Sequence, residues 1–239
     1  MSTDDTNQVD ALKTETEPFV ASKLGSKDHW DNVYGREINN FKDNGDIGEV
    51  WFGEAAATKM VSWVCANIED EDARILDVGC GNGHLLLELA EEHYTNLVGT
   101  DYSAQAVELA RSIALSREAS ITYMEQNFLD LQEVACVAGD EKFDVVLDKG
   151  TYDAICLKPK DSDDVSVDQS AINIYPMSVV GSLKDTGVFL ITSCNWTEDE
   201  LVSRFEPYLE CIGRVKNKSF QFGGVVGQTV ATVAFKKRT

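Results

Sequence analysis

The 239-residue chain has 41 Asp and Glu against 21 Lys and Arg, a formal net charge of −20, and 43% of its residues are hydrophobic. This hydrophobic share suffices for the core of one α/β domain, and the negative charge disfavours binding to nucleic acid. The sequence has neither a run of about eighteen apolar residues nor the basic and apolar regions of a signal peptide. We therefore expect no membrane association and a cytoplasmic location, with the nucleus as an alternative.

No metal site and no disulfide framework are predicted. The six cysteines include no C-x-x-C pair, and in an intracellular chain they are expected to be small buried hydrophobic residues. The three histidines lack metal-ligand spacing. The acidic surface would attract a basic protein partner or would only aid solubility, and the charge alone does not decide between these interpretations.

The N-terminal segment divides into a tail and a helical extension. Residues 1–22 are polar, acidic and aperiodic, which predicts a disordered tail. Residues 23–68 are predicted to be an extension of the domain, because apolar residues at three-to-four-residue spacing indicate an amphipathic helix from Lys27 to about Phe41. A glycine-containing loop and a second helix over 54–67 follow. In the loop, Trp51 and Phe52 are either core aromatics or a cover for a cofactor.

The most informative motif is R-I-L-D-V-G-C-G-N-G-H at residues 74–84. An apolar strand ends near Asp77, and Gly79, Gly81 and Gly83 turn the chain into a leucine-rich helix. Glycines permit positive φ angles and let a ligand approach the backbone, while the helix start offers unpaired N–H groups. This arrangement is typical of a nucleoside-cofactor site.

The spacing of the motif separates two kinds of cofactor. The dinucleotide fingerprint is G-x-G-x-x-G, whereas this loop is G-x-G-x-G with Asp77 before it. A carboxylate there would repel a pyrophosphate but tolerates a cationic ligand that carries an amino acid group. Asp101 follows the next strand, 18 residues after Gly83 (101 − 83), where it suits a ribose diol. The pattern resembles motif I of the class I S-adenosylmethionine-dependent methyltransferases.

Strands and helices alternate through the remaining core, residues 69–239. This βαβ alternation predicts a mainly parallel sheet with helices on both faces, and the resemblance implies the Rossmann-like, seven-stranded class I methyltransferase sheet that closes with a C-terminal antiparallel hairpin. The predicted helices are 84–92, 104–116, 170–184 and, from a capping box at 197–200, a helix to about 208. The predicted strands are 74–78, 96–100, 121–126, 143–148, 188–193, 214–222 and 229–235.

Polar residues follow several of the predicted strands at one rim of the sheet, where ligands of such folds bind. Asn127 and Phe128 would contact the edge and the face of adenine, or Asn127 would only cap its loop. The predicted cofactor-binding residues are Trp51, Asp77, Gly79, Cys80, Gly81, Asp101, Tyr102, Asn127, Phe128 and Asp148.

The segment D-K-G-T-Y-D-A-I at 148–155 follows the fourth strand of the core. Methyl transfer to an amine is an in-line displacement that depends on positioning. Asp148, with Tyr152, would orient a lysine ε-ammonium and receive or relay its proton; alternatively, Asp148 caps the turn at 149–151. Asp153 would serve the same purpose or cap a helix. The acid-rich loop 161–168 is either a solvated loop or a contact for a basic substrate.

Five segments together match a more specific pattern: 24–34, 46–53, 148–155, 189–197 and 220–224. These segments resemble one family, the small single-domain lysine methyltransferases that act on translation elongation factor 1-alpha. The resemblance implies a cytoplasmic enzyme that methylates a lysine of this factor. We expect it to be a monomer. Asn127, where an acid is common, and the loop at 161–164 depart from the pattern. A methyltransferase for another protein or a small molecule, or a non-catalytic cofactor-binding module, remain alternatives.

Overall fold

The computed structural model describes most of the chain. Residues 1–19 of the predicted tail and 161–166 of the acid-rich loop lie outside the described residues. The described ranges are 20–160, 167–216, 219–222, 225–228 and 230–238.

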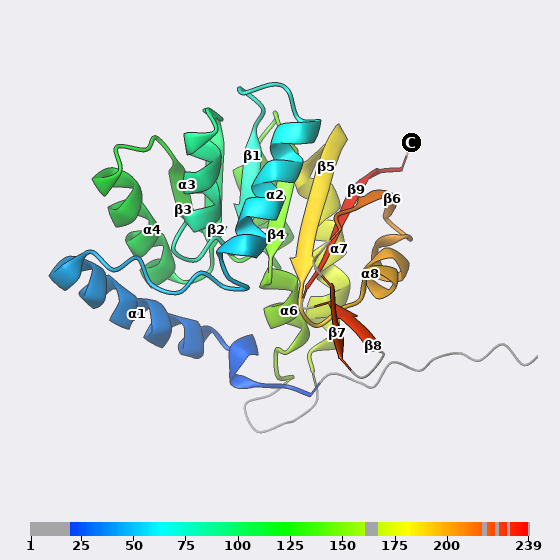
Figure 1. Cartoon of the computed structure of the whole chain (residues 1–239), viewed down its shortest axis with the longest axis horizontal. Coiled ribbons are helices and arrows are strands. Elements are labelled where there is room, and N and C mark those ends of the chain that lie inside the picture. Colours follow the sequence, from blue (N-terminus) through cyan, green and yellow to red (C-terminus); the bar gives the residue numbers. More distant parts are fainter. Residues whose placement is uncertain (1–19, 161–166, 217–218, 223–224, 229, 239) are drawn as a thin grey trace, which may run out of the picture.

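A seven-stranded sheet forms the centre of the molecule, in the order β3-β2-β1-β4-β5-β9-β6 (Figure 1). The first five of these strands are parallel, and β9 runs antiparallel to both β5 and β6. The strand order reverses between β1 and β4, which places a ligand site at their carboxyl ends. The strands are β1 Ile75–Val78, β2 Leu97–Asp101, β3 Thr122–Glu125, β4 Phe143–Lys149, β5 Leu183–Ser193, β6 Leu209–Arg214 and β9 Ala231–Lys237.

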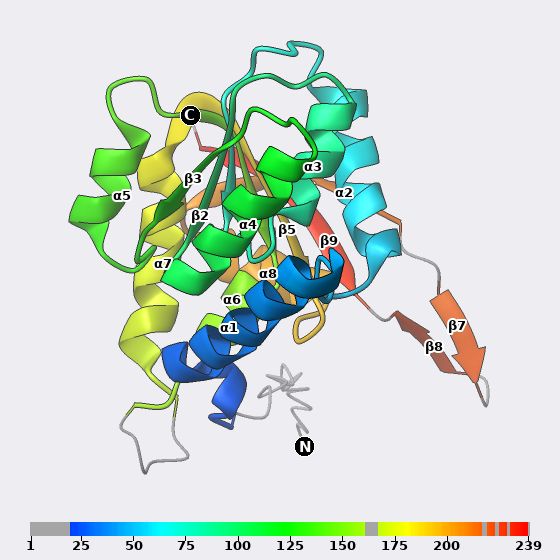
Figure 2. The ribbon, with the colours of Figure 1, turned by 90° about the vertical axis from the view of Figure 1, so that its left-hand side faces the viewer.

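Helices cover both faces of the sheet, as Figures 1 and 2 show. One hydrophobic cluster joins α1, α2, α3 and α4 to one face, and the other joins α5, α6, α7 and α8 to the opposite face. Alternate strand residues serve the two clusters: Ile75 lies in the first and Leu76 in the second. The helices are η1 Lys23–Gly25, α1 Lys27–Asn44, α2 Glu54–Asn67, α3 His84–Glu91, α4 Ala104–Ser116, α5 Leu131–Ala138, α6 Thr151–Cys156, α7 Gln169–Ser182 and α8 Glu198–Phe205.

The predicted α/β architecture is confirmed, but the predicted strand over 214–222 is wrong. The chain makes two strands there. β6 ends at Arg214 and pairs with β9, while β7 (Ser219–Phe222) pairs with β8 (Val225–Gln228) in a separate hairpin. Helix α8 ends at Phe205, earlier than predicted, which leaves Leu209 to begin the edge strand. The helices α5 and α6 were not among the predicted elements.

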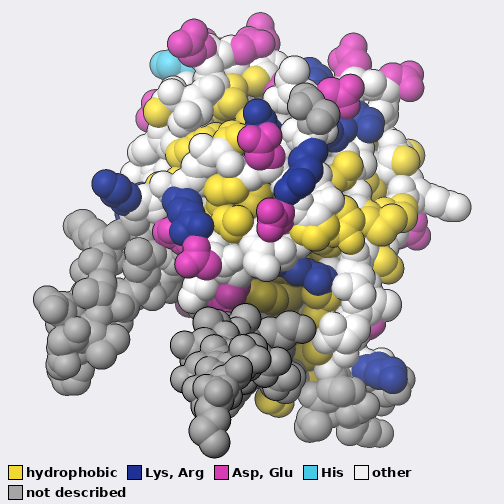
Figure 3. Space-filling view, turned by 90° about the vertical axis from the view of Figure 1, so that its right-hand side faces the viewer, with side chains coloured by type: hydrophobic (Ala, Val, Ile, Leu, Met, Phe, Trp, Pro, Cys, Tyr) yellow, Lys and Arg dark blue, Asp and Glu magenta, His cyan; other side chains and the backbone are white. Residues whose placement is uncertain are grey.

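The face beside α8 and β6 carries hydrophobic, basic and acidic side chains in mixture (Figure 3). Tyr208 and Ile212 are exposed at this edge of the sheet. Arg214 pairs with Asp199 at 2.7 Å, and Lys236 with Glu210 at 3.5 Å. Because opposite charges alternate here, the negative net charge of the chain does not produce a field of one sign on this face.

Candidate functional site

A cavity of about 850 Å³ opens at the carboxyl ends of the parallel strands. Its walls come from the ends of β1, β2, β3 and β4, from α6, and from the N-terminal segment between Leu24 and Phe52. Most of the predicted cofactor-binding residues therefore meet in one place. Those on the wall are Trp51, Gly79, Cys80, Gly81, Asp101, Tyr102, Asn127 and Phe128.

The glycine loop fits against its neighbours only because it has no side chains. Gly79 and Gly81 have φ angles of +63° and +54°, a region that residues with a Cβ rarely adopt. A Cβ on Gly79 would collide with the Thr151 side chain, and one on Gly81 would lie 2.6 Å from the Tyr34 hydroxyl oxygen. The loop thus exposes backbone to the cavity and leaves room for a ligand.

Asp101 is held at the end of β2 by two backbone groups. Its Oδ2 accepts from the Gly81 N–H at 3.1 Å and its Oδ1 from the Ser103 N–H at 2.9 Å. The side chain is buried, and burial raises its pKa to about 6, although both hydrogen bonds oppose the shift. Each oxygen keeps a further lone pair, so the carboxylate can accept from a pair of hydroxyls such as a ribose diol.

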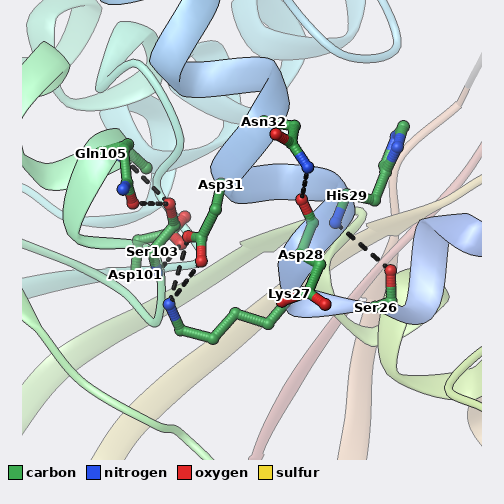
Figure 4. A network of polar contacts seen from close by, with 10 residues as sticks. Ser26, Lys27, Asp28, His29, Asp31, Asn32, Asp101, Ser103 and Gln105 are labelled. Carbon is green, nitrogen blue, oxygen red and sulfur yellow. Dashed lines mark hydrogen bonds and ion pairs between the residues drawn. The ribbon is translucent and has the colours of Figure 1, made fainter. Parts of the chain in front are cut away.

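The beginning of α1 lies over Asp101 (Figure 4). The Lys27 ammonium pairs with Asp31 at 2.9 Å and lies 5.8 Å from the centre of the Tyr102 ring. Both charged residues act on Asp101, Lys27 lowering its pKa and Asp31 raising it. The N-terminal extension therefore contributes to the electrostatics of the cavity.

Asp77 lies behind the glycine loop and is not one of the residues that line the cavity. It is buried, and within the described residues its carboxylate has no hydrogen bond. Burial raises its pKa to about 7; Lys149 opposes the shift, whereas Asp148 and Asp101 add to it. A buried carboxylate without a hydrogen-bond partner favours a cationic ligand nearby.

At the end of β3 the structure separates the roles of two neighbouring amides. Asn127 is exposed, and its Oδ1 accepts from the Leu129 N–H at 3.1 Å, so it caps its loop. Gln126 is buried on the cavity wall, and its Oε1 has no partner among the described residues. The sequence interpretation missed Gln126, whose only signal is its place at the end of the strand.

Asp148 and Tyr152 lie behind the cavity wall, with no exposed surface. The Asp148 carboxylate accepts from the N–H groups of Thr151 at 2.8 Å and Tyr152 at 2.9 Å, and from the Tyr175 hydroxyl. The Tyr152 hydroxyl accepts from Arg204 Nε at 2.8 Å. Asp148 therefore caps the turn after β4, and neither residue is open to a substrate here.

Asp153, from the first turn of α6, does line the cavity together with Asn195. The Asp153 carboxylate accepts from the Ser193 hydroxyl and, at 2.8 Å, from the Cys194 N–H, which joins α6 to the end of β5. Burial raises the pKa of Asp153 above its usual range, and these hydrogen bonds oppose the shift. Of the two acids in the D-K-G-T-Y-D segment, only Asp153 is on the wall.

Aromatic residues of the N-terminal extension form the opposite wall. Trp30 meets Trp51 edge to face with 4.8 Å between ring centroids, and its Nε1 donates to the Leu24 carbonyl at 2.7 Å. Phe52 has a positive φ of 64°, uncommon for a residue other than glycine. Its ring occupies the space that a Cβ on Gly150 would need. Trp51 and Phe52 thus line the cavity.

Two absences hold for the part of the chain that the structure describes. There, no group of three or more His, Cys, Asp and Glu side chains is arranged to hold a metal ion. Nor does any helix combine the length and the apolar character that crossing a membrane requires.

Comparison with known proteins agrees with this geometry. A methyltransferase-domain family matches residues 69–232. EEF1A lysine methyltransferase 2 of Danio rerio is 39% identical over 238 residues, covering 99% of this chain and 97% of the relative. Protein-lysine N-methyltransferase EFM4 of Saccharomyces cerevisiae is 40% identical over 234 residues, covering 93% and 98% of the two chains.

Solved structures share the fold. The N-methyltransferase NodS from Bradyrhizobium japonicum, in complex with S-adenosyl-L-homocysteine, superposes with a TM-score of 0.60 at 14% identity. The match covers 88% of this chain and 99% of NodS. In the present chain, the glycine cradle, the unpartnered Gln126 oxygen and the Asp77 carboxylate fit a nucleoside with a cationic amino acid group. The chain belongs to the EEF1A lysine methyltransferase 2 family of S-adenosylmethionine-dependent protein-lysine methyltransferases.

Proposed function

We propose that this protein transfers a methyl group from S-adenosylmethionine to a lysine ε-amine of translation elongation factor 1-alpha. The observation that carries the proposal is the near-complete match to EEF1A lysine methyltransferase 2, 39% identical over 99% of this chain. The cavity supports it independently, because most of the residues expected for a nucleoside cofactor meet on its wall.

The order of the strands gives the direction in which the cofactor would lie. Gln126 and Phe128 at the end of β3 would face the adenine, and Asp101 at the end of β2 would accept from the ribose hydroxyls. The glycine loop after β1 would hold the methionyl part. Since β4 and β5 come next in the sheet, the reacting end would lie beside residues 149–155 and 193–195. Bound S-adenosylmethionine supplies an electrophilic methyl group on a sulfonium.

The residues near that end have separate tasks in the proposal. Asp153, with Asn195 beside it on the wall, would draw the target ammonium into line and accept its hydrogen bonds. A proton must leave the amine for its lone pair to react, and a carboxylate of raised pKa is suited to receive it. Asp148 and Tyr152 would act by position, since Asp148 holds the turn that carries Thr151 and Tyr152.

The extension 23–68 and the core 69–239 would work as a single domain. Trp30, Tyr34 and Trp51 pack into the same hydrophobic cluster as the glycine-loop residue Cys80. In this proposal the enzyme acts as a monomer in the cytoplasm, where elongation factors act. The net charge of −20 favours a basic protein substrate over nucleic acid.

Mass spectrometry of recombinant elongation factor 1-alpha, incubated with the protein and S-adenosylmethionine, tests the proposal. We expect one lysine of the factor to gain about 14 Da, the mass of one methylene unit, for each methyl group that is transferred. The Asp101→Ala variant serves as the control: it should lose cofactor affinity and leave the factor unmodified.

Two results would contradict the proposal in different ways. If an enzyme that binds cofactor modifies other proteins in a cell extract but not this factor, the substrate is wrong. If cofactor binds and no acceptor in the extract is labelled, the alternative of a non-catalytic binding module replaces it.

A further inference from the structure

Lys149 presents a cation to the cavity, and no acidic side chain of the described residues lies within salt-bridge distance of its ammonium. Its Nζ donates to the Trp51 carbonyl oxygen at 3.0 Å, and within the described residues it forms no salt bridge. A lysine ammonium has three donors, so two remain for another group. Lys149 also belongs to the cavity wall.

The residues around Lys149 indicate what kind of group would pair with its charge. Asp148, one residue earlier, points to Tyr175 of α7, whereas Lys149 reaches the Trp51 loop, as strand alternation requires. Burial lowers the pKa of the Lys149 ammonium, and Asp77 and Asp148 oppose the shift. Lys149 is half-buried, and removing a charge even partly from water is costly unless the charge is paired. The structure therefore holds a site that an anionic group would complete.

The position of Lys149 in the sheet indicates which part of a ligand would supply the anion. Val78 of β1 is in register with Asp148 of β4, so the residues that follow them, Gly79 and Lys149, lie at the same level of the rim. Asp77 and Lys149 thus place opposite charges on adjacent strands beside the glycine loop. The methionyl group is a zwitterion, and its carboxylate is the only anion in S-adenosylmethionine.

We propose that Lys149 on the cavity wall binds the carboxylate of the methionyl group, while the buried carboxylate of Asp77, behind the glycine loop, attracts its ammonium by charge. Two neighbouring strands would then recognise the zwitterion. The inference rests on the proposed cofactor and extends it to a residue that sequence motifs did not single out. Because the same ammonium holds the Trp51 carbonyl, the bound carboxylate and the covering loop share one anchor.

Isothermal titration calorimetry with two thioethers tests the assignment without any methyl transfer. One ligand is S-adenosylhomocysteine, and the other is its decarboxylated form, which keeps the adenosine and the amine. The wild-type protein should bind the decarboxylated ligand about tenfold to a hundredfold more weakly, the loss expected for a hydrogen bond to a charged group.

The Lys149→Met variant should lose a similar factor for S-adenosylhomocysteine and almost nothing for the decarboxylated ligand. Lys184→Met is the control, because Lys184 lies outside the cavity wall and pairs with Asp144 at 2.7 Å. It should leave both affinities unchanged. Lys149→Arg, which keeps the charge, should recover part of the preference for the carboxylate.

Equal binding of the two ligands by the wild-type protein would overturn the assignment, and this comparison requires no variant. An equal loss for both ligands in Lys149→Met would reduce Lys149 to an anchor of the Trp51 loop. Failure of both ligands to bind would overturn the proposed cofactor as well. Normal discrimination in a protein that does not methylate elongation factor 1-alpha would sustain the assignment of Lys149 and refute only the substrate.

Discussion

The Thr151 hydroxyl donates to the Val78 carbonyl oxygen at 2.6 Å, which joins the first turn of α6 to the end of β1. The Thr151 side chain thereby fills the space that a side chain on Gly79 would need. The glycine loop and the D-K-G-T segment, 69 residues apart in sequence (148 − 79), are thus one packed unit. The loop proposed to hold the cofactor therefore depends on the segment proposed to face the substrate.

Gly79→Ala should therefore be strongly destabilising. The positive φ of 63° costs an alanine about 1–2 kcal/mol, and the contact with Thr151 adds overpacking of about 1–3 kcal/mol. Urea denaturation should show a correspondingly lower free energy of unfolding, and calorimetry a weaker affinity for S-adenosylhomocysteine.

Gly35→Ala is the matched control for Gly79→Ala. Gly35 lies inside α1, its φ is ordinary, and nothing lies within 4 Å of where its Cβ would be. The same substitution there should stabilise the protein by about 0.5–1 kcal/mol, since alanine favours helix. Equal stability of the two variants would show that the contact between Gly79 and Thr151 does not constrain the loop.

The central sheet could be predicted from the sequence because its strands are short apolar runs bounded by glycines and helices. The C-terminal region could not, since one extended β-forming run conceals the point after Arg214 where the chain leaves the sheet. Helix α6 could not be predicted, because its six residues are too few to show a helical period.

The candidate site divides along the same line. Glycine spacing and Asp101 were predictable because backbone conformation and strand order fix their places. Whether a side chain lines the cavity or lies behind its wall could not be predicted. Asp148 and Asp153 occur in one motif, yet only Asp153 lines the cavity. Lys149 and Gln126 could not be predicted, because their proposed roles depend on hydrogen-bonding groups that the folded structure leaves without a partner.

The cofactor-free protein should become less stable as the pH rises from about 5 to 7.5. Burial raises the pKa of Asp101 to about 6 and that of Asp77 and Asp148 to about 7, from a usual value of 3.8. Over this interval the folded chain keeps protons that the unfolded chain has released, so the free energy of unfolding falls with pH. Urea denaturation at several pH values measures the slope.

Asp148→Asn should make that slope shallower, because it removes one of the three titrating groups. Asp185→Asn, at an exposed carboxylate that pairs with Lys237, is the control and should leave the slope unchanged. A slope in Asp148→Asn as steep as in the wild type would show that Asp148 is not protonated preferentially in the folded state.

Cofactor binding should release protons at pH 7. Burial raises the pKa of Asp77 to about 7, and a nearby ammonium and sulfonium would lower it. The fraction of molecules that hold this proton would then lose it. Calorimetry of S-adenosylmethionine binding in buffers of different ionisation enthalpy counts the released protons.

The release should disappear in Asp77→Asn and should fade in the wild type at pH 8.5, where the carboxylate is already ionised. Proton uptake at pH 7 would mean that the ligand's positive charge lies away from Asp77.

Asp153→Asn should reduce methylation of elongation factor 1-alpha while leaving cofactor affinity unchanged. The amide keeps the shape of the side chain but loses the negative charge that would draw in the ammonium, so kcat/KM should fall about tenfold to a hundredfold. Steady-state kinetics with the protein substrate and calorimetry with S-adenosylhomocysteine provide the two measurements.

Ser193→Ala separates charge from structure, because it removes the hydroxyl that donates to Asp153 and leaves the carboxylate in place. If Asp153 acts through its charge, Ser193→Ala should lose much less activity than Asp153→Asn. Equal losses would show that Asp153 only joins α6 to the end of β5.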